Sequence, residues 1–96
     1  MSDEMTDILQ QRLKASPDAF ASAVGDETVL LQVKRGTYYG LDAIGTRIWA
    51  GLNEGRSPAE ICQQIAAEHG VPIETVEADA RAFLEDLKAN EIIVAD

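Results

Sequence analysis

The spacing of apolar residues changes once along the chain, near residue 42, and this change restricts the possible folds more than any other feature. Between residues 20 and 41, apolar side chains alternate with period two in three short runs, as they do in β-strands. Gly25-Asp26 and Arg35-Gly36 are turn signals between these runs. Beyond residue 42, apolar side chains recur every three or four residues, as they do on helices. The sequence therefore predicts an α+β fold, in which a three-stranded antiparallel meander precedes a three-helix core of the winged helix-turn-helix kind.

The period-two pattern also assigns side chains to the two faces of the meander. The expected strands cover residues 20–24, 27–34 and 37–41. In the second strand, one face is expected to carry Val29, Leu31 and Val33. In the third strand, Tyr39 and Leu41 share one face and Tyr38 lies on the other.

Start and stop signals bound the three helices. Asp42 is expected to cap a first helix that extends to about residue 53. Ser57, followed by Pro58 and Glu60, predicts the start of a second helix that Gly70 ends. The third helix is expected over residues 73–89, and residues 91–94 form either a last short strand or an extended segment packed on the core. We expect residues 1–12 to be a flexible tail and residues 13–96 to be one domain.

The charge of the chain argues against nucleic acid as its partner. Seventeen acidic and eight basic side chains give a net charge of −9, and the basic residues are spread along the sequence. The third helix, which would enter the major groove in a DNA reader, carries mostly carboxylates that phosphate would repel. An anionic surface can instead attract a basic segment, although it also serves solubility.

Membrane, metal and enzymatic functions also find little support in the sequence. No apolar run approaches the ~20 residues that span a membrane, and the acidic first residues do not resemble a signal peptide, so a cytoplasmic location is expected. Cys62 and His69 are single residues of their kind and seven positions apart, too few for a structural zinc site. We expect no cofactor, no metal and no catalytic residue, and interpret Cys62 as a partly buried helix residue.

The third strand offers a different kind of site. It lies at the edge of the meander, and a free strand edge has unpaired N–H and C=O groups that an extended peptide can satisfy. Tyr38 and Tyr39 would add side-chain contacts to such a peptide. From composition alone, the more common role for both tyrosines is that of ordinary strand residues that pack on the helices.

Several segments resemble the PqqD family, the peptide-recognition domains that serve ribosomally made and post-translationally modified peptides. The similar segments are Gly36-Thr37-Tyr38-Tyr39-Gly40-Leu41-Asp42, Ile44-Gly45-Thr46-Arg47-Ile48-Trp49, Ser57-Pro58-Ala59-Glu60-Ile61 and residues 76–84. The resemblance covers about residues 18–95 and is carried by hydrophobic spacing and a Tyr-x-Leu-Asp turn rather than by catalytic residues. It is greater to the stand-alone members of lasso-peptide pathways than to those that assist pyrroloquinoline quinone assembly.

The resemblance implies a function and a site. Members bind the leader segment of a precursor peptide as a strand added beside the third strand, and deliver it to a leader peptidase, cyclase or radical enzyme. The implied strand wall is Thr37, Tyr38, Tyr39, Gly40 and Leu41, and the implied helix wall is Val76, Asp79, Ala80 and Phe83. Asp79 or Glu77 can pair with a basic leader residue or remain solvated.

Other interpretations remain open at this stage. A chaperone for pyrroloquinoline quinone or another radical-enzyme pathway would share the same site. The trihelical core is also compatible with a winged-helix DNA-binding regulator. The interpretation as a small enzyme is supported only by the presence of Cys62 and His69. The chain is expected to be a monomer or a weak homodimer, since a free strand edge can pair with its own copy.

Overall fold

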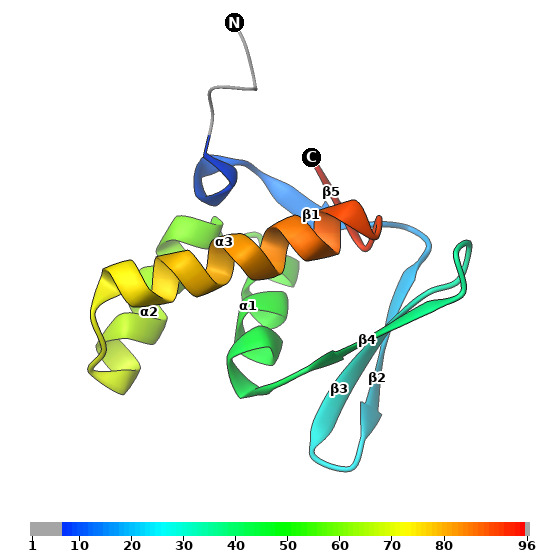
Figure 1. Ribbon diagram of the computed structural model, residues 1–96, viewed down its shortest axis with the longest axis horizontal. Coiled ribbons are helices and arrows are strands. Elements are labelled where there is room, and N and C mark those ends of the chain that lie inside the picture. The colour runs from blue at the N-terminus through cyan, green and yellow to red at the C-terminus, as the bar shows by residue number, and fades with distance from the viewer. Residues whose placement is uncertain (1–6, 96) are drawn as a thin grey trace, which may run out of the picture.

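The computed structural model describes residues 7–95, which form one sheet of three strands, three helices and a smaller two-stranded ladder (Figure 1). In chain order the elements are η2 (Ile8–Gln10), β1 (Leu13–Ala15), β2 (Ala19–Val24), β3 (Glu27–Gln32), β4 (Thr37–Leu41), α1 (Ala43–Asn53), α2 (Pro58–His69), α3 (Ile73–Ala89) and β5 (Ile93–Ala95). The meander and the trihelical core that the sequence predicts are both confirmed.

The three-stranded sheet is antiparallel in the order β2-β3-β4, so β2 and β4 are its two edges. Leu31 in the middle strand pairs with Phe20 on β2 and with Tyr38 on β4. One face of the sheet contributes to the core through Leu30 and Leu41, while the other is open. Val29, Leu31 and Val33 do share a face, but it is the outer one, because Leu30 and Gln32 point inward.

Side-chain caps explain why the first two helices begin where they do. The Oδ1 atom of Asp42 accepts a hydrogen bond from the backbone N–H of Gly45 at 2.7 Å, and Ser57 Oγ accepts one from the N–H of Glu60 at 3.2 Å. Gly70 ends α2 in the left-handed conformation, with φ of 64°, which favours glycine. The predicted caps of α1 and α2 and the predicted bounds of all three helices are confirmed.

The core lies between the helices and is completed by the sheet and both ends of the described chain. Leu84 and Leu87 of α3 and Ile61 and Ile65 of α2 are fully buried. Helices α1 and α2 approach closely at Gly51, where an added Cβ would lie 2.7 Å from the Ile61 side chain. Burial of such apolar surface is the main stabilising contribution to a fold of this size.

The segment before β1 is part of the domain, which corrects the expected tail over residues 1–12. Ile8 and Leu9 form a turn of 3₁₀-helix and are buried in the core, Leu9 with 1% of its surface exposed. Asp7, which caps this turn, also forms an ion pair with Arg81 of α3 at 2.7 Å. Burial of Ile8 and Leu9 against α2 and α3 removes apolar surface from water, which stabilises this segment in the folded state. The domain therefore begins no later than residue 7. Residues 1–6 lie outside the described residues.

The last strand of the described chain pairs with the first strand, β1. Residues 93–95 form β5, which is one of the two expected conformations, and its antiparallel partner is β1, with Leu13 opposite Ala95. The strand at residues 13–15 was not expected, because three residues are too short for a period to be recognised. This ladder extends the core beneath α3.

Candidate peptide-binding groove

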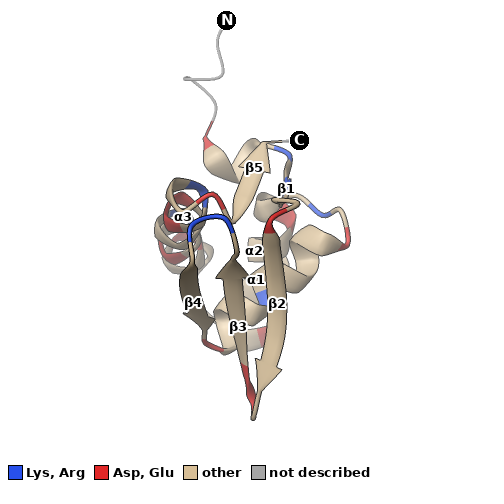
Figure 2. Ribbon diagram, turned by 90° about the vertical axis from the view of Figure 1, so that its right-hand side faces the viewer, with Lys and Arg blue, Asp and Glu red and all other residues tan. Residues whose placement is uncertain are grey.

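The edge strand β4 and one side of α3, at Asp79, Phe83 and Asp86, border a strip of surface that is called the groove below. In Figure 2 the sheet is seen from its open face, with β4 at the edge nearest α3. Tyr39 of β4 reaches across to α3, where its ring meets the Phe83 ring edge-on at a centroid distance of 6.0 Å. Its hydroxyl donates a hydrogen bond to Asp86 Oδ2 at 3.1 Å. These two contacts fix the spacing of strand and helix.

The backbone of β4 presents specific hydrogen-bonding groups to the groove. The N–H of Val33 donates to the carbonyl oxygen of Asp18 at 3.0 Å, which marks a hydrogen-bonded pair between β2 and β3. Because bonded pairs alternate along antiparallel strands, the odd-numbered residues of β3 bond to β2 and the even-numbered ones to β4. On β4, these even residues pair with Thr37, Tyr39 and Leu41. The N–H and C=O groups of Tyr38 and Gly40 therefore point away from the sheet at its open edge.

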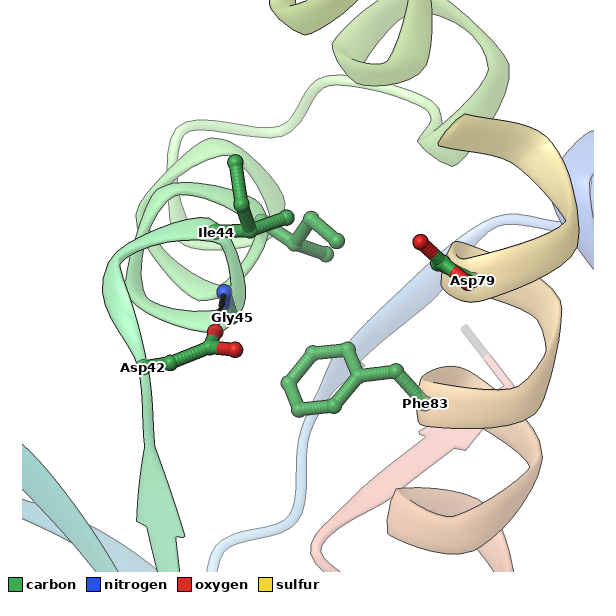
Figure 3. Close-up of a pocket in the computed structure, with 6 residues that line it drawn as sticks. Asp42, Ile44, Gly45, Asp79 and Phe83 are labelled. Carbon is green, nitrogen blue, oxygen red and sulfur yellow. Dashed lines mark hydrogen bonds between the residues drawn. The ribbon is translucent and has the colours of Figure 1, made fainter. Parts of the chain in front are cut away.

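A pocket lies at the end of this edge, where β4 turns into α1 (Figure 3). It has a volume of about 190 Å³, and its lining residues are Asp42, Ile44, Gly45, Ile48, Asp79 and Phe83. Gly45 permits close approach here, since an added Cβ would lie 3.4 Å from the Phe83 ring. A second pocket of about 230 Å³ shares Ile44 and Asp79 with the first and continues toward the start of α3. Its walls are mostly apolar, including Ile65, Val71 and Val76.

The structure divides the predicted site residues into two groups. Tyr38, Gly40 and Asp79 are exposed, while Thr37, Tyr39 and Phe83 are half-buried at the groove. Leu41, Val76 and Ala80 are buried and contribute to the core. Ala80 therefore packs closely inside the core, and Leu41 lies on the inner face of β4. Val76 also lines the second pocket.

Sequence reasoning missed the α1 wall of the pocket and one acidic residue of α3. Ile44, Gly45 and Ile48 line the pocket because the cap at Asp42 directs α1 past Phe83. Asp86 is one of the carboxylates of the third helix and was not predicted as a site residue, although Asp79, Phe83 and Asp86 follow the i, i+4, i+7 spacing of one helical stripe. That spacing was a signal available in the sequence.

Acidic side chains surround the groove. Asp42 and Asp79 line the first pocket, and Asp86 holds Tyr39. Burial, together with the hydrogen bond to Asp86 and the charges of Asp86 and Asp42, raises the pKa of Tyr39 above its ordinary value of 10.0. The tyrosine is thus a neutral donor throughout the physiological range, and the groove is suited to an uncharged or basic extended segment.

The thiol of Cys62 lies in the core, away from this groove. Cys62 is buried, and burial and the charge of Glu77 raise the pKa of its thiol. No cluster of three or more potential metal-ligating side chains occurs among residues 7–95. In the same range no helix has both the length and the apolar character needed to cross a membrane.

The fold and the groove define a class of small winged helix-turn-helix domain with an open strand edge beside its last helix. The chain matches the family described as "Coenzyme PQQ synthesis protein D (PqqD)" over residues 27–93, and it belongs to this PqqD family. No curated protein sequence matches it significantly.

Two solved structures are similar over most of the chain. One is described as "TbiB1 in Complex with the TbiA(beta) Leader Peptide", with 46% identity, a TM-score of 0.77, and coverage of 86% of this chain and 99% of that one. The other is "Lasso peptide synthetase B1 complexed with the leader peptide", with 26% identity, a TM-score of 0.80, and coverage of 86% and 98%. Both proteins were thus solved with a leader peptide bound.

Proposed function

We propose that this protein is a non-catalytic recognition protein that binds the leader segment of a ribosomally made precursor peptide and delivers it to a processing enzyme. A leader peptidase or cyclase of a lasso-peptide pathway is the enzyme that the comparisons favour. The observation that carries the proposal is the open edge of β4 beside α3, in a chain that resembles two leader-bound proteins over 86% of its length.

The leader binds by strand addition in this proposal. The outward N–H and C=O groups of Tyr38 and Gly40 form main-chain hydrogen bonds with the leader, as in other cases of β-augmentation. Tyr38, which is 74% exposed, covers the added strand from the outer face of the sheet. Thr37, Tyr39 and Phe83 contact it from the side of α3, while the buried Leu41, Val76 and Ala80 support these contacts through packing.

Specificity arises from the pocket between α1 and α3. An apolar leader side chain fits between Ile44, Ile48 and Phe83, and a buried anchor of this kind supplies most of the affinity in many interfaces. The exposed carboxylate of Asp79 at the rim of both pockets favours a basic residue beside that anchor. Because this pair would be solvated, we expect it to contribute only about 0–1 kcal/mol.

A second candidate function uses the same groove. The family description names pyrroloquinoline quinone synthesis, so a peptide chaperone for that or another radical-enzyme pathway is the alternative. Binding of a lasso-peptide leader would support the first function, and binding of a leader from a radical-enzyme pathway would support the second. A DNA-binding role is disfavoured because α3 carries carboxylates on its exposed side, including Asp79, Glu85 and Asp86. The cytoplasm, where precursor peptides are made, is the location consistent with this proposal.

The test is isothermal titration of the full chain with a synthetic leader peptide from a lasso precursor encoded beside it. Gly40→Pro removes one outward N–H without removing a hydrogen bond to β3, and should weaken leader binding about tenfold or more. Ala21→Pro, the equivalent change on the opposite edge strand, should leave the affinity within about twofold and serves as the matched control. Equal affinity of Gly40→Pro and the unmodified chain would rule out strand addition at β4.

A further inference from the structure

We propose that β2, the other edge of the sheet, is a second docking site, which takes an extended strand with basic ends from the processing enzyme. The inference rests on the proposed function for the identity of the partner. It does not rest on the β4 groove for its geometry, because β2 and β4 are separated by β3. Both edges can therefore be occupied at the same time.

The first observation is that β2 is an open and unprotected edge. Its sequence, Ala-Phe-Ala-Ser-Ala-Val, contains no proline and no charged residue. Its register with β3 is continuous from residue 19 to residue 24, so no bulge interrupts the edge. Proteins usually protect a free edge with lysine, proline or a bulge, because such an edge pairs readily with other strands. An edge without these features is expected to be covered in the functional assembly.

The second observation concerns the backbone groups on that edge. The bonded pairs between β2 and β3 involve Phe20, Ser22 and Val24, by the same alternation that assigned the β4 edge. The N–H of Ala19 donates to the carbonyl oxygen of Ser16 at 3.0 Å. The groups that remain directed outward are the N–H and C=O of Ala21 and Ala23, which form a complete site for two residues of an added antiparallel strand.

The third observation is the exposed apolar surface beside this edge. Phe20 is 56% exposed and Val24 is 59% exposed, and both lie on the outer face of β2. Phe20 is continuous with Leu31 and Tyr38 across the three strands, which forms one apolar row. A strand added beside β2 would cover the exposed side of Phe20 and Val24 with its own outer side chains.

Charge selects the occupant of this edge. Acidic residues lie at both ends of β2: Asp18 precedes it, and Asp26 and Glu27 follow it (Figure 2). An antiparallel second copy of β2 would place Asp18 of one chain near Asp26 of the other at both ends, and each chain carries a net charge of −9. A strand with an apolar centre and Lys or Arg at its ends would instead place positive charges beside Asp18, Asp26 and Glu27. The edge therefore fits a different protein better than a second copy.

The processing enzyme is the partner that the function requires at this place. A leader strand on β4 and an enzyme strand on β2 would extend the sheet to five strands. At ~4.8 Å per strand spacing, the two added strands would lie about 19 Å apart. The enzyme would thus be held beside the leader without competing for its backbone groups.

The experiment measures binding of a purified leader peptidase from the same pathway to the full chain by isothermal titration, with and without saturating leader peptide. Ala21→Pro removes an outward N–H of β2, and Asp26→Lys reverses the charge at one end of the edge. Each should weaken peptidase binding about tenfold or more, while leader affinity stays within about twofold. Gly40→Pro should instead weaken leader binding about tenfold or more and leave peptidase affinity within about twofold. Glu85→Lys, an exposed charge reversal on α3, should change neither by more than about twofold.

The possible outcomes separate this inference from the proposed function. Unchanged peptidase binding by both Ala21→Pro and Asp26→Lys would overturn the β2 site. If Ala21→Pro fails to fold, unchanged binding by Asp26→Lys alone would overturn it, because Asp26 lies in an exposed turn and its replacement leaves the fold intact. A dimer in sedimentation velocity that Ala21→Pro dissociates would assign the edge to a second copy and overturn it as well. Failure of the unmodified chain to bind leader would contradict the proposed function, whereas the titration without leader would still report on β2.

Discussion

Tyr39 connects β4 to α3, and the contribution of its hydroxyl group can be tested by removing that single oxygen atom. Its hydroxyl bonds to Asp86, and its ring contacts Phe83. The folded state raises the pKa of Tyr39 above 10.0, mainly through burial and the Asp86 hydrogen bond. Because the neutral hydroxyl is the favoured form, the stabilisation is complete below about pH 10 and is lost as the pH rises through the folded pKa.

Replacing Tyr39 with Phe should therefore remove a part of the alkaline loss of stability. We expect urea unfolding of the unmodified chain to show a falling free energy of unfolding between pH 9.5 and pH 11, and the Tyr39→Phe variant to show a smaller fall. Tyr38→Phe, on the exposed face, is the control with the same chemical change. Identical pH profiles for Tyr39→Phe and the unmodified chain would mean that folding does not raise the pKa of Tyr39.

At the scale of the element, the first turn of α1 determines the shape of the pocket. Asp42 caps the helix through the N–H of Gly45, and both residues line the pocket. Asp42→Ala should lower the free energy of unfolding by about 0.5–2 kcal/mol, the usual effect of losing a capping side chain. Asp42→Asn retains a capping oxygen and should lower it much less, as measured by urea denaturation. If both variants lose the same stability, the charge and not the cap is responsible.

The elements also show which features a sequence reveals. Caps at Asp42 and Ser57 and stops at Gly70 and Pro72 are local, so the helix bounds were predictable. The pairing of β1 with β5 joins residues about 80 positions apart, and no local pattern reports such a contact. In the near-continuous apolar run Val29-Leu30-Leu31, period two does not say which face is buried. The buried Gln32 is kept there by hydrogen bonds to Glu91 and Lys34 that only the folded chain forms.

The same limit applies to the site. The edge strand at residues 37–41 was predictable because Tyr-Tyr-Gly-Leu-Asp is a local motif, and the resemblance to the PqqD family supplied the role that we propose for it. The helix wall was predictable only in part, because a stripe of residues does not say which members reach the core. Asp79 and Phe83 line the pocket, whereas Ala80 packs inside. The approach of Gly45 to Phe83 depends on the crossing of two helices, which the sequence does not specify.

At the scale of the whole molecule, the N-terminal turn stabilises the domain from the side of α2 and α3. Ile8 and Leu9 belong to the same core as Leu84 and Ile61. Ile8→Ala should lower the free energy of unfolding by about 2–5 kcal/mol, the usual cost of truncating a buried isoleucine. The neighbouring exposed Gln10→Ala should change it by less than about 0.5 kcal/mol. Denaturant unfolding measures both, and a loss below about 0.5 kcal/mol for Ile8→Ala would show that this turn is not part of the core in solution.

The β1–β5 ladder brings Leu13 and Ala95 side by side, so the first and last strands of the folded domain are adjacent. A flexible linker that leaves η2 in place could join the two ends covalently, and the chain could then be opened at the exposed Gly25-Asp26 turn without breaking a helix. Such a circular permutant would retain the order of pairing in the sheet while freeing one end of β2 and one of β3. We therefore expect the circular permutant to fold and to retain most of the contacts of the unmodified chain.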